Sequence, residues 1–141
     1  METTDYCSYE LSKVLKAAGF DEPCIAQWAC EPDGKPILLG STAFVFSNAE
    51  LKGRDVTAPL LFHAQKWLRE KWDLHIDVFP VADCSLDADG QVCEECNYWT
   101  FDIMHVISTR KIVEDEEQYG SYEEALSEGI KSALELIKKG E

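Results

Sequence analysis

Apolar positions recur along the chain with two different periods, which predict where helices and strands form. From Asp5 to Ala18 they follow the three-to-four-residue spacing of one helical face, with Asp5 or Thr4 as a possible cap. The same spacing returns in residues 57–72, where Thr57 is the expected cap. It returns again after Ser121, which forms a capping box with Glu124. We therefore expect three amphipathic helices.

Alternating or short apolar runs predict four strands between these helices. Two are CIAQWAC (24–30) and PILLGSTAFVF (36–46), joined by the turn EPDGKP. The others cover residues 74–81 and 98–107. Sequential strands favour antiparallel pairing. The predicted fold is α+β in the order α-β-β-α-β-β-α: one domain over residues 1–141, with a largely antiparallel four-stranded sheet and helices mainly on one face.

Composition narrows the class of protein. The chain has 141 residues, of which 45% are apolar, which suits a single packed domain without disulfides or metals. No apolar run approaches the ~20 residues needed to cross a bilayer. The N-terminal METTDYCSYE lacks the basic and apolar regions of a secretory signal. We expect a cytoplasmic protein of a bacterial or phage-infected cell, with no membrane association.

Charge is the strongest global feature, and it is unevenly distributed. The net charge is −14; residues 82–97 hold five acids and no base, and residues 114–141 hold nine acids and three bases. Such a field repels phosphate, so direct binding to nucleic acid or anionic membranes is not expected. It attracts basic proteins or cations. Solubility alone is the simpler explanation of the same surface.

The six cysteines fall into two groups. In a reducing compartment, Cys7, Cys24 and Cys30 are expected to pack as small hydrophobic residues. Cys84, Cys93 and Cys96 form the metal-site hypothesis, because the pair in Cys93-Glu94-Glu95-Cys96 has a spacing used for zinc, with His75 or His105 as a possible fourth ligand. Incidental thiols in an acidic hairpin are the alternative. The segment also partly matches a calcium loop through Asp87, Asp89, Gly90 and Val92, but the first and last ligand positions do not fit, so we interpret residues 87–90 as a turn.

A second constellation comprises His75, Asp77 and Asp102. If the third and fourth strands pair, all three project from the face opposite the main apolar one, where they could perform acid–base work or bind a metal. The alternative is a solvated sheet face, which needs polar residues anyway. We expect His105 to be a hydrogen-bonded core residue and His63 to lie at the edge of the core.

Two segments carry a resemblance. TAPLLFHAQKWLREKW and SYEEALSEGIKSALELI resemble segments of small hypothetical proteins of gut bacteria and their phages or prophages. The resemblance implies no assigned activity, cofactor or catalytic residue.

Three hypotheses of function follow. The first is a non-enzymatic accessory or interaction protein associated with a phage or mobile element, whose acidic surface binds a basic host protein. The second is a metal-binding module using Cys84, Cys93 and Cys96, with zinc as the metal. The third is a small enzyme using the face of His75, Asp77 and Asp102. An unpaired edge strand could also form a homodimer.

Overall fold

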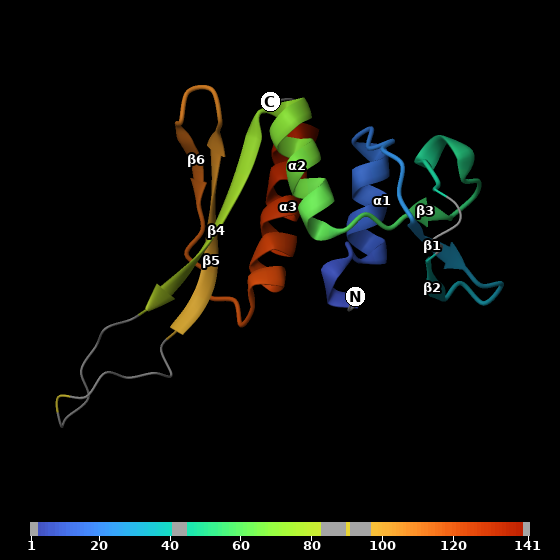
Figure 1. Cartoon of the computed structure of the whole chain (residues 1–141), viewed down its shortest axis with the longest axis horizontal. Coiled ribbons are helices and arrows are strands. Elements are labelled where there is room, and N and C mark those ends of the chain that lie inside the picture. Colours follow the sequence, from blue (N-terminus) through green and yellow to red (C-terminus); the bar gives the residue numbers. More distant parts are fainter. Residues whose placement is uncertain (1–2, 41–44, 83–89, 91–96, 140–141) are drawn as a thin grey trace.

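The computed structural model describes residues 3–40, 45–82, 90 and 97–139, which form three α-helices and two three-stranded antiparallel sheets (Figure 1). The predicted α+β class is confirmed. The helices are α1 (Tyr9–Ala17), α2 (Leu61–Trp72) and α3 (Tyr122–Lys138). One sheet has the order β2-β1-β3, with β1 (Ala26–Cys30), β2 (Pro36–Gly40) and β3 (Val56–Thr57). The other has the order β4-β5-β6, with β4 (Leu74–Ala82), β5 (Asn97–His105) and β6 (Lys111–Glu114).

The prediction of one four-stranded sheet is wrong. Both predicted hairpins form, with Cys30 opposite Pro36 in the first and Asp77 opposite Asp102 in the second. Each hairpin gains its own third strand instead of joining the other. β3 pairs with β1, and β6 pairs with β5. Strands of two and four residues are too short to show a clear alternation, so the sequence pattern did not reveal them.

The starts of the first two helices also differ from the prediction. Ser8 caps α1, since its Oγ accepts a hydrogen bond from the Leu11 N–H at 3.2 Å. Thr57 does not cap α2, because it lies in β3 and its N–H donates to Asn48 Oδ1 at 3.0 Å. The helix α2 begins only at Leu61. The spacing of apolar residues therefore predicts that a helix is present more reliably than it predicts the residue at which the helix begins.

The helices lie between the two sheets. In Figure 1, α2 and α3 cover one face of the β4-β5-β6 sheet, α1 lies beside them, and the β1–β3 sheet is on the far side of α1. One hydrophobic core joins these layers and includes Leu11, Leu15, Leu68, Ile76 and Ile130, all less than 10% exposed. Trp67 and Leu68 are buried as predicted, at 7% and 0% exposure. Burying such side chains is the main favourable contribution to folding.

The small sheet is attached to α1 by polar and aromatic contacts. The Trp28 indole N–H donates to the Cys7 carbonyl oxygen at 2.9 Å, and the Trp28 ring packs edge-to-face with Tyr9. Cys7 itself is fully buried, and its N–H donates to the Pro59 carbonyl at 2.8 Å. The residues just before α1 therefore connect β1 with the segment that leads into α2.

The helix α3 lies very close to the main sheet. Its predicted cap is confirmed: Ser121 Oγ accepts from the Glu124 N–H at 3.1 Å, and Glu124 Oε2 accepts from the Gly120 N–H at 3.3 Å. Farther along, Gly129 faces β4, and a Cβ atom there would lie 2.5 Å from Ile76 Cγ2. Only glycine allows this approach.

Candidate functional site

The outer face of the β4-β5-β6 sheet brings acidic side chains together. Asp77 of β4 lies directly opposite Asp102 of β5, and Asp102 lies opposite Glu114 of β6 on its other side. Three carboxylates thus form one row across the sheet. His75 lies two residues from Asp77 on the same strand, so it shares this face. The predicted common face of His75, Asp77 and Asp102 is confirmed.

Lys111 partly neutralises this carboxylate row. Its Nζ donates to Asp102 Oδ2 at 3.2 Å and lies 4.0 Å from Glu114 Oε1. The hydrogen bond to Asp102 and the charges of Asp102, Glu114 and Asp77 raise the pKa of Lys111, so the ammonium stays charged. The row of three carboxylates and one lysine therefore keeps an excess of negative charge.

The structure does not link His75 to these carboxylates through its Nδ1. That atom is buried and has no hydrogen-bond partner in the described part of the chain. Across the strand pair, His75 lies opposite Met104 rather than an acid. Asp102 is bound to Lys111 instead. A general base needs a partner that orients it and a proton within reach. The described contacts supply no such partner to His75 Nδ1.

Apolar side chains flank the carboxylate row on this face, with Met104 beside His75 and the others beyond Asp77. Phe79 lies opposite Thr100, and Val81 lies opposite Tyr98. Phe79, Val81, Tyr98 and Met104 are all partly exposed. The helices α2 and α3 lie against the opposite face of this sheet (Figure 1). We call the positions His75, Asp77, Phe79, Val81, Tyr98, Asp102, Met104, Lys111 and Glu114 the outer face.

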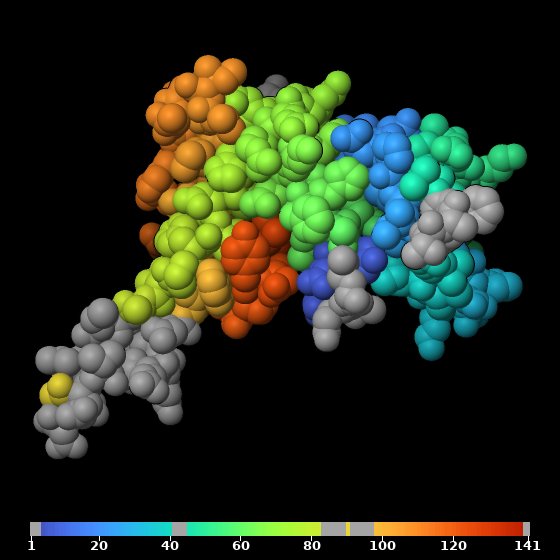
Figure 2. All heavy atoms as spheres, viewed as in Figure 1, coloured from blue at the N-terminus to red at the C-terminus, as the bar shows by residue number. Residues whose placement is uncertain are grey.

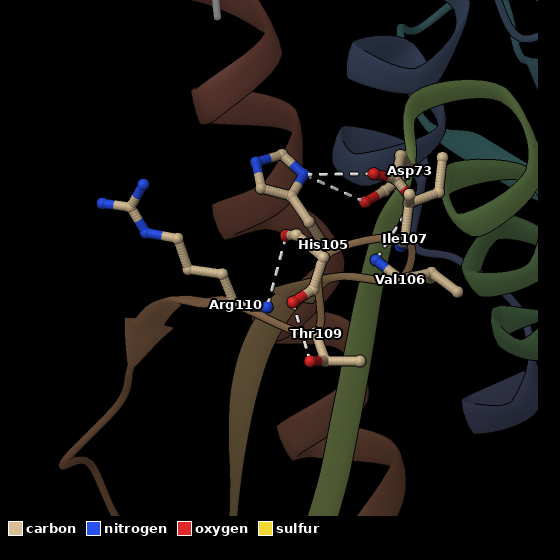
Figure 3. A network of polar contacts seen from close by, with 7 residues as sticks. Asp73, His105, Val106, Ile107, Thr109 and Arg110 are labelled. Carbon is tan, nitrogen blue, oxygen red and sulfur yellow. Dashed lines mark hydrogen bonds and ion pairs between the residues drawn. The ribbon is translucent and has the colours of Figure 1, made fainter.

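Asp73 and His105 form a contact that the sequence did not reveal. It joins the end of α2 to the β5–β6 turn (Figure 3). Asp73 has φ 56°, in the left-handed region, and ends α2. Its Oδ1 accepts from the Val106 and Ile107 N–H groups at 3.0 and 3.2 Å, and its Oδ2 lies 3.5 Å from His105 Nδ1. Asp is one of the few residues that tolerate this conformation, but sequence spacing could not predict a contact over more than 30 residues.

The structure places one of the other two histidines as predicted and the other differently. His105 makes polar contacts as expected, but its placement in the core is wrong, because its side chain is 42% exposed beside Asp73. His63 does lie at the edge of the core, with its ring edge-to-face against Phe20. Burial lowers the pKa of His63, and Lys66 adds to this lowering while Glu22 opposes it.

Of the cysteines that the structure describes, Cys7 and Cys24 pack in the core as predicted, whereas Cys30 is only partly buried and lies outside the core. Cys7 and Cys24 are buried, and Cys30 Sγ lies 3.1 Å from the Tyr9 hydroxyl. Burial is the main cause that raises the pKa of Cys7 and raises that of Cys24 to about 11, so both stay as thiols near neutral pH.

The hypothetical metal ligands Cys84, Cys93 and Cys96 lie outside the described residues, as do Asp87 and Asp89. Gly90 is described, with φ 81° in an exposed bend. Within residues 3–40, 45–82, 90 and 97–139, no group of three or more His, Cys, Asp and Glu side chains is placed to hold a metal ion. This finding does not test the cysteine site.

Comparison with known proteins gives no family for this chain. No protein-family model matches it, and neither a curated protein nor a solved structure is significantly similar to it. Among the described helices, none combines the length and the apolar content that crossing a membrane requires.

Proposed function

We propose that this protein is a non-enzymatic interaction protein that binds a basic protein partner through the outer face of its β4-β5-β6 sheet. The observation that carries the proposal is the row of Asp77, Asp102 and Glu114 beside partly exposed Phe79 and Tyr98, on the face opposite the helices. Interfaces favour aromatic side chains and methionine at their centres and complementary charge around them. The resemblance to phage and prophage proteins supports a mobile-element setting for this activity.

The net charge of −14 supports the same partner class. A negative field accelerates association with a positively charged protein and disfavours acidic competitors. Lys111 fixes the buried Asp102 carboxylate, which leaves Asp77 and Glu114 as the acids of the row with greater exposure. We therefore expect Asp77 to contact a lysine or arginine of the partner.

Two outer-face variants and one control variant with the same charge change test the proposal. The full chain is immobilised and exposed to host lysate, and captured proteins are identified by mass spectrometry. Each captured basic protein is then purified and its affinity measured for the wild type, Asp77→Lys and Phe79→Ser. Glu31→Lys is the matched control, because Glu31 is exposed in the β1–β2 turn and the charge change is the same.

The proposal expects Asp77→Lys and Phe79→Ser to weaken binding by about tenfold or more, as central interface residues do. Glu31→Lys should change the affinity by much less. Equal losses for Asp77→Lys and Glu31→Lys would show only attraction to net charge. Unchanged binding by the two outer-face variants, with folding verified by circular dichroism, would refute this surface as the interface.

A further inference from the structure

The strand β2 forms one edge of the small β2-β1-β3 sheet, and no other strand in the described part of the chain pairs with its outer side. Its side chains are accessible there. Ile37 and Leu39 are 39% and 44% exposed, and a Cβ atom on Gly40 would meet no described atom within 4 Å. An accessible edge strand is a template for pairing with another strand.

The register of the β1–β2 hairpin shows which backbone groups of β2 point outward. Cys30 lies opposite Pro36, but its N–H donates to Asp55 Oδ1 at 3.0 Å, on the side away from β2. Cys30 and Pro36 are therefore a pair without mutual hydrogen bonds. Such pairs alternate with hydrogen-bonded pairs along an antiparallel ladder, and their backbone groups point away from each other. Pro36, Leu38 and Gly40 consequently direct their backbone polar groups outward from the sheet.

These outward groups are complementary to a second copy of themselves. When two β2 strands pair antiparallel around a two-fold axis at Leu38, the Leu38 N–H of each copy donates to the Leu38 carbonyl of the other. The Gly40 N–H of each copy then donates to the Pro36 carbonyl of the other. Proline lacks an N–H, and in this arrangement the Gly40 carbonyl is the outward acceptor that stays with water. The pattern therefore fits an interface that uses the same surface on both copies.

Apolar side chains accompany this backbone pattern. Ile37 and Leu39 lie on one face of β2, and the two-fold axis places Ile37 of each copy opposite Leu39 of the other. Cross-strand pairs of this kind stabilise a sheet. The strand carries no charged side chain, whereas the edge strands β4 and β6 carry Asp77 and Lys111. Charges on an edge discourage pairing with another chain, and β2 lacks them.

The charge distribution allows two copies to approach each other at this end of the molecule. Residues 24–57, which contain the whole small sheet, hold four acids and three bases, a net charge of −1 out of −14. The small sheet and the β4-β5-β6 sheet lie at opposite ends of the molecule (Figure 1). The acidic outer faces of two copies joined at β2 are therefore far apart, and salt screens repulsion over such distances.

We infer that two copies of this chain form a symmetric dimer by pairing their β2 strands antiparallel around Leu38. The two small sheets then become one continuous sheet, and the expected edge-strand homodimer is assigned to this edge. Each copy keeps its outer face uncovered, because that face lies at the other end of the molecule. The inference does not depend on the proposed binding of a basic protein.

Sedimentation equilibrium of the full chain tests dimerisation. The protein is examined from about 1 µM to about 200 µM at about 0.15 M sodium chloride, which spans the dissociation constants of weak and moderate dimers. We expect the mean mass to rise from that of one chain to that of two. It should rise no further, because a two-fold interface is closed.

Two substitutions at Leu38 separate the backbone contribution from the side chain. Leu38→Pro removes the outward N–H but leaves the hydrogen bonds between β1 and β2 in place, so it should weaken dimerisation by about tenfold or more. Leu38→Ala is the matched control, since it shortens the side chain and keeps the N–H. It should change the dissociation constant by less than about threefold.

Charged double variants test the antiparallel register. Ile37→Lys with Leu39→Lys places lysine opposite lysine across the two-fold axis, and the corresponding pair of glutamate substitutions places glutamate opposite glutamate. Each double variant alone should be monomeric, because like charges directly opposite each other repel. An equimolar mixture of the two should form a heterodimer. Ile107→Lys with Ile112→Lys is the matched control, since both isoleucines are exposed on the other sheet, and it should dimerise like the wild type.

The inference is overturned if the full chain stays monomeric over this concentration range, which includes the case in which β2 pairs only with a strand of another protein. It is equally overturned if Leu38→Pro dimerises as tightly as Leu38→Ala, or if the mixed lysine and glutamate variants stay monomeric. Circular dichroism verifies that each variant is folded. If Leu38→Pro is not folded, the charged double variants and their control decide the outcome.

Discussion

At the scale of single residues, Asp73 stabilises the fold through both its backbone conformation and its side chain. It ends α2 in a left-handed conformation, and its carboxylate accepts two backbone N–H groups of the β5–β6 turn. Its own N–H donates to the Leu68 carbonyl. This residue therefore couples the end of a helix to a turn that lies 33 and 34 residues later in the sequence.

Replacing Asp73 with glycine or alanine separates these two tasks. Asp73→Gly keeps the backbone conformation without strain but removes both acceptors, which should lower the free energy of unfolding by about 1–3 kcal/mol. Asp73→Ala also places a Cβ at φ 56°, so it should cost about 1 kcal/mol more. Urea unfolding measures both values. An alanine variant as stable as the glycine variant would contradict the conformational part of this explanation.

His63 predicts a pH dependence of stability. Burial lowers the pKa of His63 in the folded protein, whereas the unfolded chain keeps the usual value near ~6.5. The unfolded state thus binds more protons below about pH 6.5, and the stability that neutral His63 contributes is lost as the pH falls through this region toward the lower folded pKa.

His63→Gln tests this dependence, because glutamine does not titrate. Urea midpoints measured between about pH 7.5 and pH 5 should fall more steeply for the wild type than for the variant. Carboxylates titrate in both proteins, so their effect cancels in the comparison. Parallel curves would show that His63 does not contribute to the acid sensitivity.

At the scale of elements, the contact between α3 and the main sheet depends on one missing side chain. Gly129 is buried, with Ile76 and Phe101 directly beneath it. Glycine inside a helix ordinarily costs roughly 0.5–1 kcal/mol relative to alanine. Its presence in the middle of α3 therefore indicates that close packing outweighs helix propensity.

Gly129→Ala should consequently destabilise the protein by about 1–3 kcal/mol, although alanine favours helices. The new methyl group would lie 2.5 Å from Ile76 Cγ2 and force α3 or β4 to move. Gly120→Ala is the matched control, because its Cβ would meet only Glu124 Oε2 at an ordinary 3.7 Å. Thermal unfolding measures both variants, and equal stability of the two would contradict this account of the packing.

The elements that the sequence predicted are those whose neighbours in space are neighbours in sequence. The cap at Ser121 and the antiparallel pairing of β1 with β2 depend on nearby residues, so they could be predicted. The strands at Val56 and Lys111 form only because β1 and β5 lie beside them in the folded chain. Strand parity placed Asp77 and Asp102 on one face, whereas the contact of Asp73 with the β5–β6 turn joins residues more than 30 positions apart, which no local pattern encodes.

At the scale of the whole molecule, the negative charge opposes folding. A net charge of −14 on a chain of this length produces self-repulsion that is stronger in the folded state than in the expanded unfolded state. Glu116 and Glu117, both exposed between β6 and α3, lie in the densest acidic run. At 0.1 M, salt screens the repulsion between exposed charges that lie more than about 10 Å apart.

We therefore expect added sodium chloride to stabilise the protein. The urea midpoint should rise between about 0.02 M and 0.3 M salt, with little change in the slope of the unfolding free energy. The double variant Glu116→Gln, Glu117→Gln should be more stable at low salt and respond less to salt. A midpoint that falls as salt is added would mean that specific ion pairs outweigh the repulsion.

The order of the elements along the chain has a consequence for synthesis on the ribosome. The first sheet uses residues before α2, the second uses residues after it, and Figure 2 shows these two parts at opposite ends of the molecule. The helix α3 follows both sheets in the sequence, yet it contacts α1, α2, β4 and β5. Until α3 has been synthesised, Ile76 and Phe101 of the main sheet lack the helix that packs on them at Gly129, so stable structure is expected only after translation has passed this helix.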